Sequence, residues 1–117
     1  MIVIDQDAGR LVGYGTWGHV DAVGTREERH IEIGWFGVDA AYQGVRDDAG
    51  NRVADLIYAT VEEAALAHPE SSDDMPFTLE CHVDNARGLN FWQSQGYDLL
   101  PDPQHRVENE NYYRMVR

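Results

Sequence analysis

The sequence has no lysine, and all 9 of its basic residues are arginines. Against them stand 21 aspartates and glutamates, which gives a formal net charge of -12. Because phosphate contacts need a basic face and an anionic membrane surface repels acidic proteins, this balance argues against nucleic-acid and membrane-surface binding. The acid excess indicates either adaptation to high intracellular salt, which we favour because the acids are spread along the whole chain, or attraction of cationic substrates.

Cysteine is almost absent as well. The single Cys81 excludes an intramolecular disulfide and a cysteine-based metal site, and its strand-like surroundings favour a buried structural thiol over a nucleophile. The 5 histidines show no i, i+4 pairing, so we expect no metal site. No apolar run approaches the roughly 20 residues of a membrane helix, and the first residues do not resemble a signal peptide. We therefore expect a soluble, cytoplasmic protein.

A chain of 117 residues has room for one hydrophobic core, so we predict a single domain over residues 1–117. A long helix is expected from an N-cap at Asn51 to His68–Pro69, and a short one from a cap at Asp84 or Asn85 to Gly96. The crossover through the long helix predicts that strands 30–38 and 77–83 are parallel neighbours. The remaining pairings should be antiparallel. In all, the patterns predict strands over 1–5, 11–20, 30–38, 77–83, 97–100 and 111–116.

Side-chain alternation assigns faces to these elements. In strand 30–38, Ile31, Ile33 and Trp35 are expected on one face, and His30, Glu32, Gly34 and Phe36 on the other. The buried face of the long helix is expected to consist of residues at i, i+3, i+4, i+7, i+8 and i+11, namely Val53, Leu56, Ile57, Thr60, Val61 and Ala64.

The loop over residues 40–50 leads into the N-terminus of the long helix. Unpaired amides and the positive end of the helix dipole suit a diphosphate at such a junction, with Arg46 and Arg52 adding charge. The alternative is an ordinary loop that starts a helix.

Two segments resemble the GNAT superfamily of acetyl-CoA-dependent N-acyltransferases. Residues 31–44, IEIGWFGVDAAYQG, look like the strand that leads into the family's pyrophosphate loop. Residues 85–97 are similar to its later helix, N-x-x-A-x-x-F-Y-x-x-x-G-F, with matches at Asn85, Phe91 and Gly96. The resemblance implies an α/β (α+β) fold with a mixed, mostly antiparallel sheet, a central splayed parallel strand pair and two main helices. The strand and helices that open the family's fold have no counterpart in these patterns.

The resemblance also implies where acetyl-CoA binds, in the cleft between strands 30–38 and 77–83. The pantetheine arm would pair with the backbone of Phe36, Gly37 and Val38. Residues 45–51 look like an insertion in the family's phosphate loop, so Gln43 and Arg46 are both candidates for its first position. Asp47 and Asp48 are unfavourable beside a diphosphate unless they point into solvent or bind a cation. The other implied cofactor contacts are Gly50, Asn51, Arg52, Val53, Ala54, Asn85 and Trp92.

The implied function is transfer of an acetyl group from acetyl-CoA to a primary amine by direct attack; the alternative is a non-catalytic acyl-CoA-binding regulatory domain. Glu32 lies at the position that resembles the family's base, and a structural or substrate-binding role is the alternative. Trp92 replaces the family's acidic tyrosine, and indole has no useful acidity. Tyr97, Tyr112 or Tyr113 could substitute, or the thiolate leaves unassisted. We expect a homodimer, because a fold without its opening elements would expose apolar surface.

Overall fold

The computed structural model describes residues 2–5, 10–20, 29–99 and 111–117. The predicted turn at 6–10 and the loops at 21–29 and 101–110 lie largely outside these residues. A 6-stranded sheet has the order β1-β2-β3-β4-β6-β5. The elements are β1 (Ile2–Asp5), β2 (Arg10–Val20), β3 (His30–Val38), η1 (Ala40–Tyr42), α1 (Val53–Ala67), β4 (Phe77–His82), α2 (Ala86–Ser94), β5 (Asp98–Leu99) and β6 (Tyr112–Val116).

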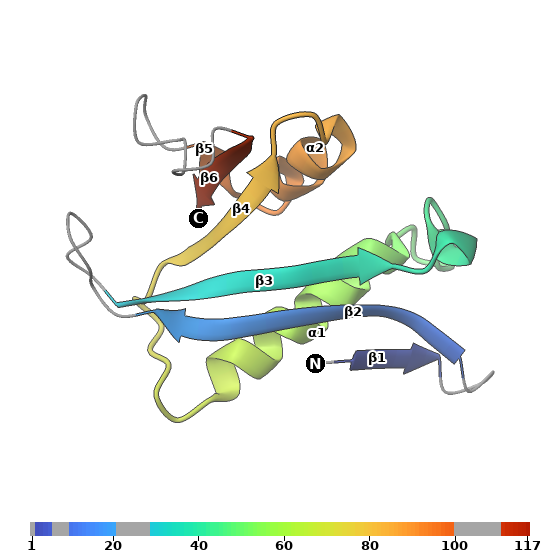
Figure 1. The fold of residues 1–117 in the computed structure, drawn as a ribbon. Coiled ribbons are helices and arrows are strands. Elements are labelled where there is room, and N and C mark those ends of the chain that lie inside the picture. The colour runs from blue at the N-terminus through green and yellow to red at the C-terminus, as the bar shows by residue number, and fades with distance from the viewer. Residues whose placement is uncertain (1, 6–9, 21–28, 100–110) are drawn as a thin grey trace. The chain divides into compact units, whose positions relative to one another are not determined.

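This architecture confirms the predicted α+β fold, with a mixed sheet and two helices (Figure 1). The pairs β1–β2, β4–β6 and β5–β6 are antiparallel. β3 and β4 are joined through α1 and begin side by side, since the Ile31 amide donates to the Pro76 carbonyl at 3.0 Å. No helix of the described residues is long and apolar enough to span a membrane.

The chain forms two compact units, residues 1–18 with 33–73 and residues 19–32 with 74–117. The first contains β1, most of β2, the later part of β3, and α1. The second contains the start of β3 together with β4, α2, β5 and β6. The single domain over 1–117 stays a prediction.

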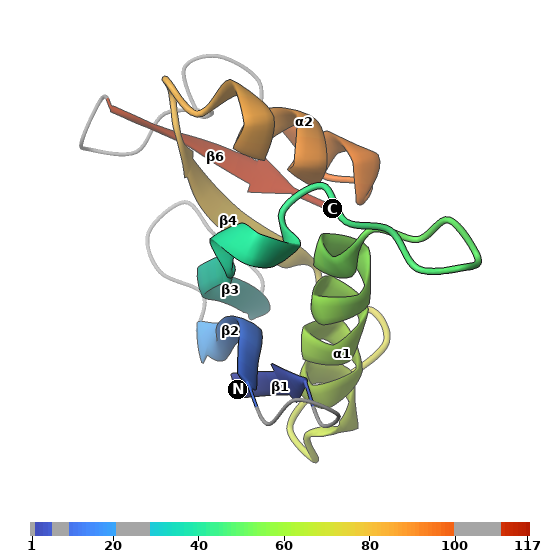
Figure 2. The ribbon, with the colours of Figure 1, turned by 90° about the vertical axis from the view of Figure 1, so that its right-hand side faces the viewer.

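In the first unit, α1 lies beside β2 (Figure 2), and two glycines of β2 face the helix. A Cβ atom at Gly13 would overlap Ile57, and one at Gly15 would overlap Val61. The buried residues of α1 are Ile57, Tyr58, Val61 and Ala65. The predicted face was therefore partly wrong, because Leu56 is 44% exposed and the exposed Thr60 hydroxyl donates to the Leu56 carbonyl at 2.9 Å.

β3 does not keep the predicted alternation. Ile33 is buried, whereas Trp35 is 75% exposed, and Phe36 packs its ring against Tyr58 of α1 at 6.4 Å between centroids. Two consecutive residues of β3 face Thr16 of β2: a Cβ atom at Gly34 would lie 2.6 Å from the Thr16 Oγ1, and the Trp35 amide donates to that oxygen at 2.8 Å. The Cβ position of Gly37 faces Tyr14, which lies on the same face of β2 as Thr16. Regular alternation would put residues 34 and 37 on opposite faces, so we infer a β-bulge between them that shifts the phase of the strand. The predicted faces of Trp35 and Phe36 were wrong for this reason.

In the second unit, α2 begins at the N-cap Asn85, whose side chain accepts from the Gly88 amide at 2.9 Å. It ends before Gly96, which has a φ of 94° and provides the predicted left-handed C-cap. Tyr97 is fully buried, and the ring of Trp92 meets it edge-on at 5.6 Å.

The first helix has a different N-cap from the predicted one. Arg52, and not Asn51, occupies this position of α1. The short helix η1 was also not predicted; Asp39 caps it by accepting from the Ala41 amide at 2.9 Å.

Candidate functional site

The end of β3 offers backbone groups for pairing on the side away from β2. The Asp39 amide donates to the Val12 carbonyl of β2 at 2.7 Å. Backbone groups of successive strand residues point to alternate sides, so those of Val38 and Phe36 point away from β2. Gln43 donates its side-chain amide to the Val38 carbonyl at 3.1 Å. The predicted residue Gln43 thus folds back onto the end of the predicted pantetheine strand.

The segment between Gly44 and Arg52, which was predicted to be an insertion, is a closed hairpin. An antiparallel bridge joins Arg46 to Arg52, and the Val53 amide donates to the Val45 carbonyl at 3.0 Å. Within it, the Asp47 amide donates to the Asn51 carbonyl at 2.8 Å. The two ends of the hairpin are paired, so the chain enters α1 close to the point where it leaves Gly44.

Two carboxylates hold the amides and the arginine that were predicted to bind the pyrophosphate. Asp47 accepts from the amides of Ala49 at 3.0 Å and Asn51 at 2.8 Å. Asp55 accepts from the Arg52 amide at 3.1 Å and from its guanidinium at 3.0 and 2.9 Å. Hydrogen bonding to Asp55, together with its charge, raises the pKa of Arg52.

The other predicted donors of this loop also have internal acceptors. The Gly50 amide donates to the Asp47 carbonyl at 3.0 Å, and Arg46 donates through Nη1 to the Gly50 carbonyl at 2.6 Å. Ala54 lies in the first turn of α1, where an α-helix supplies no acceptor for its amides. A diphosphate at residues 50–53 would therefore replace bonds to Asp47 and Asp55. The role of these residues stays a prediction.

The remaining predicted residues lie in the second unit. Glu32 is half-buried on β3. Asn85 uses its side-chain oxygen as the α2 cap, and Trp92 is only 8% exposed and packs against Tyr97. A fully buried Tyr97 is a core residue, whereas Tyr112 is 36% exposed. No role of these side chains toward a cofactor is tested, and those roles stay predictions.

Two residues of interest were missed or misplaced. Asp55 was missed, although an acid at the third position of a helix often accepts from the amide of the N-cap residue, as Asp55 does here. Trp35 was expected on the same face as Ile31 and Ile33, and a bulge beside Gly34 has no periodic signal that would have corrected this.

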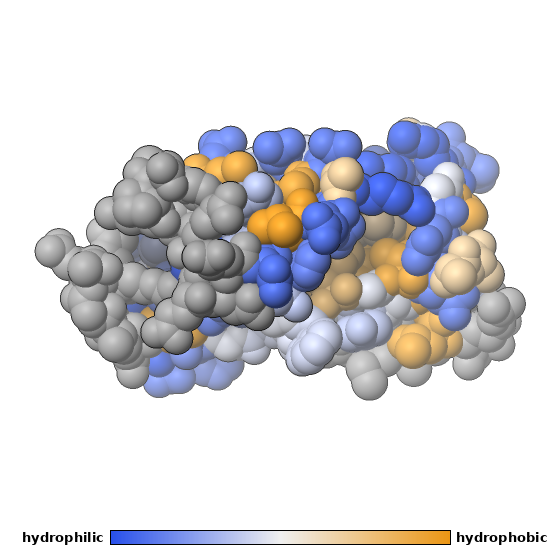
Figure 3. Space-filling view, turned by 45° about the horizontal axis from the view of Figure 1, so that its top comes forward, coloured by the Kyte–Doolittle hydropathy of each residue, from blue (hydrophilic) through white to orange (hydrophobic). Residues whose placement is uncertain are grey.

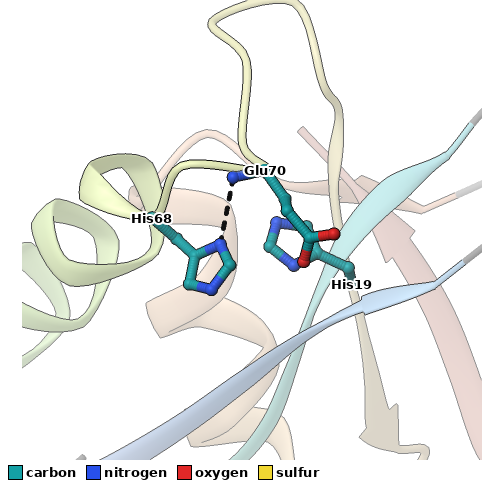
Figure 4. A group of neighbouring side chains, drawn as sticks. All are labelled: His19, His68 and Glu70. Carbon is teal, nitrogen blue, oxygen red and sulfur yellow. Dashed lines mark hydrogen bonds between the residues drawn. The ribbon is translucent and has the colours of Figure 1, made fainter.

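Histidine chemistry in the turn after α1 does not favour a metal ligand (Figure 4). The Glu70 amide donates to Nδ1 of His68 at 3.1 Å. With Nδ1 as an acceptor, the neutral ring carries its proton on Nε2, whereas a ligating Nε2 needs the proton on Nδ1. Figure 4 also draws His19, a residue of β2 that belongs to the second unit.

No protein-family model matches the chain, and no curated protein does. Among solved structures, the chain is similar to Naa20 of Chaetomium thermophilum, crystallised in complex with a bisubstrate analogue. The two share 18% identity with a TM-score of 0.66 over 99% of this chain and 63% of that chain. Naa20 is a GNAT N-acetyltransferase. The sequence resemblance is thus confirmed at the level of the fold: this chain has the GNAT fold.

Proposed function

We propose that this protein is an N-acetyltransferase that transfers an acetyl group from acetyl-CoA to a primary amine by direct attack. The observation that carries the proposal is the GNAT fold over 99% of the chain, shared with Naa20 in its complex with a bisubstrate analogue. Fold alone does not fix function, so the proposal depends on the residues at the predicted site as well.

The residues of the first unit fit acetyl-CoA in part. Phe36 and Val38 have backbone groups directed away from β2, which suits a pantetheine arm that pairs like a strand. Arg46, Arg52 and the first-turn amide of Ala54 would hold the pyrophosphate once Asp55 releases Arg52. Gln43, Gly50, Asn51 and Val53 complete this loop, and Asn85 and Trp92 are the proposed contacts from α2.

The proposed reaction requires a base that accepts the amine proton, whereas the thiolate can leave without an acid. A new bond forms between the amine nitrogen and the thioester carbonyl carbon, the carbon–sulfur bond breaks, and sulfur leaves as a thiolate. We assign the amine proton to Glu32, directly or through water. Trp92 is buried and its indole cannot protonate the thiolate, which leaves unassisted or takes a proton from Tyr112 or Tyr113.

A non-catalytic acyl-CoA-binding domain is the second candidate, and the buried Trp92 favours it. A thiol-release assay separates the two functions. Protein is incubated with acetyl-CoA and a panel of primary amines, and free CoA thiol is measured against amine-free samples. Amine-dependent release supports the transferase; binding of acetyl-CoA without release by any amine supports the regulatory domain.

We further propose that the protein is a cytoplasmic homodimer. Several large apolar side chains are exposed in one chain, including Leu56 at 44% and Leu66 at 39%, and Figure 3 shows apolar residues interspersed with hydrophilic ones on one face. Sedimentation equilibrium at molar salt tests this. A mass of about twice 13.3 kDa supports the dimer, and 13.3 kDa at every concentration contradicts it.

A further inference from the structure

Trp35 is the most exposed large apolar residue among those that the structure describes, at 75%. Tryptophan loses much of the hydrophobic free energy of burial in such a position, whereas β3 keeps Ile31 and Ile33 almost completely buried. Tryptophan is enriched at interfaces, because its ring provides a large rigid contact area.

The backbone fixes where this ring lies. Phe36 contacts Tyr58 of α1, so the preceding residue Trp35 extends from the opposite face of β3. The bond from the Trp35 amide to the Thr16 hydroxyl, at 2.8 Å, anchors the bulge to β2. Trp35 is therefore held on the face that α1 leaves open.

Tyr14 of β2 lies on the same face. It follows Gly13, whose Cβ position faces Ile57 of α1, so Tyr14 is directed away from that helix. Its ring lies over Gly37, because a Cβ atom there would be 2.7 Å from Tyr14 Cε1. Gly37 and Trp35 are two residues apart on one face, a spacing at which aromatic side chains are within reach of each other. Tyr14 is 37% exposed, and we call these two side chains on one face of the sheet, Trp35 and Tyr14, the aromatic platform.

The platform adjoins the reacting end of the proposed cofactor site, so the inference rests on the proposed function. The pyrophosphate loop follows β3, and the pantetheine arm would return along Val38 toward Phe36. Its thioester would then come close to the residue before Phe36, which is Trp35. A side chain at this point would contact the acceptor and not the nucleotide.

The charge of the acceptor is the next question, because aromatic rings and an acidic protein both favour cations. Trp and Tyr rings attract cations over their faces. Whatever the origin of the acid excess, a net charge of -12 also attracts cationic molecules where salt does not screen it. The attacking amine must be neutral, so the charge that the rings bind belongs to a second group. We propose that Trp35 and Tyr14 bind an amine acceptor that carries a second, positively charged nitrogen.

A matched pair of acceptors tests this: 1,4-diaminobutane, which keeps a cationic nitrogen when the other attacks, and n-butylamine, which does not. In Trp35→Leu we expect the KM for the diamine to rise about 3- to 30-fold, with the KM for butylamine and the Kd for acetyl-CoA unchanged. Trp35→Phe keeps a weaker aromatic face and should lie between. Leu99→Ala, an exposed apolar change on β5, should behave as wild type. Equal KM changes for both amines, or none, would overturn the proposal.

A binding measurement separates failure of this inference from failure of the proposed function. Tetramethylammonium chloride is titrated into the protein without acetyl-CoA, with sodium chloride and tert-butanol as charge and shape controls. The indole N–H signal of Trp35, assigned from its loss in Trp35→Phe, should shift with tetramethylammonium only. A shift without any acetyl-CoA binding would support the platform and reject the acetyltransferase. Acetyl transfer without such a shift would reject the platform alone.

Discussion

Arg52 is held at the start of α1 by Asp55, the carboxylate that any external anion would have to displace. The pair is i, i+3 on the helix, with the side chains 33% and 29% exposed. Asp55 also accepts from the Arg52 amide, so one side chain stabilises both the helix end and the guanidinium. The same contact that starts α1 thus weakens the predicted pyrophosphate site.

The substitution Asp55→Asn tests whether Asp55 competes with the pyrophosphate for Arg52. Loss of the charge removes the ion pair and weakens the cap, so the free energy of unfolding in urea should fall by about 0.5–1.5 kcal/mol. The freed Arg52 should at the same time tighten acetyl-CoA binding in calorimetry. Glu63→Gln, an exposed change in the middle of α1, is the control for lost charge. Weaker acetyl-CoA binding in Asp55→Asn than in this control would show that Arg52 does not contact the cofactor.

Cys81 is a buried free thiol, as expected from its position in a strand, and is 4% exposed. Burial raises its pKa above the ordinary value of 9.0, because the interior disfavours the thiolate. Well below that value the thiol is protonated in both the folded and the unfolded state, so its ionisation does not change the stability of the protein. Above it the unfolded chain loses the proton first, so stability falls as pH rises toward the folded-state pKa.

We therefore predict that urea stability falls between pH 8 and pH 10 by more in wild type than in Cys81→Ala. The variant loses stability at all pH values through the cavity it creates, so the slope and not the absolute value is compared. Equal slopes would mean that Cys81 does not titrate differently in the folded state.

At the scale of elements, glycines of β2 allow α1 to pack closely against this strand. Gly15 has no room for a side chain, since a Cβ atom would overlap Val61, whereas a Cβ atom at Gly18 of the same strand would meet nothing within 4 Å. Close approach of helix and strand thus depends on which positions of β2 carry glycine and not on the number of glycines.

Gly15→Ala should lower the free energy of unfolding by about 1–3 kcal/mol, because the added methyl forces α1 away from β2. Gly18→Ala, the matched control, should be neutral or slightly stabilising, because alanine restricts the unfolded chain. Denaturant unfolding of both variants measures the difference. An equal effect of the two substitutions would contradict the packing described for α1.

Most elements were predictable because their side chains alternate or recur with the helical period, as in β3, β4 and α1. The details that failed depend on contacts between elements. Asp55 favours Arg52 over Asn51 as the cap, and Thr16 stabilises a bulge at Trp35 that turns the ring to the open face. The hairpin before α1 depends on the Asp47 carboxylate and backbone amides, and no periodic pattern reports such bonds.

At the scale of the whole molecule, the fold could be predicted from the sequence, whereas the acceptor and the meaning of the acid excess could not. The fold was predictable from two motifs in family order, although identity to Naa20 is only 18%. The acceptor was not, because it depends on which side chains the open face exposes. The charge of -12 had two explanations, and stability in salt separates them.

If the acids are an adaptation to high salt, the melting temperature should rise as potassium chloride increases from dilute to molar concentration, because screening removes repulsion between carboxylates. Thermal melts followed by circular dichroism measure this. A constant or falling melting temperature would favour an acidic surface that attracts cationic acceptors.

The central claim is that this fold binds acetyl-CoA as its acyl donor. Calorimetric titration of the protein with acetyl-CoA, in dilute and in molar salt, tests it most directly. We predict saturable binding of one acetyl-CoA per chain under at least one of these conditions, accompanied by a rise in melting temperature. If neither heat nor a thermal shift were seen at millimolar acetyl-CoA, in dilute salt and in molar salt alike, this claim would be contradicted.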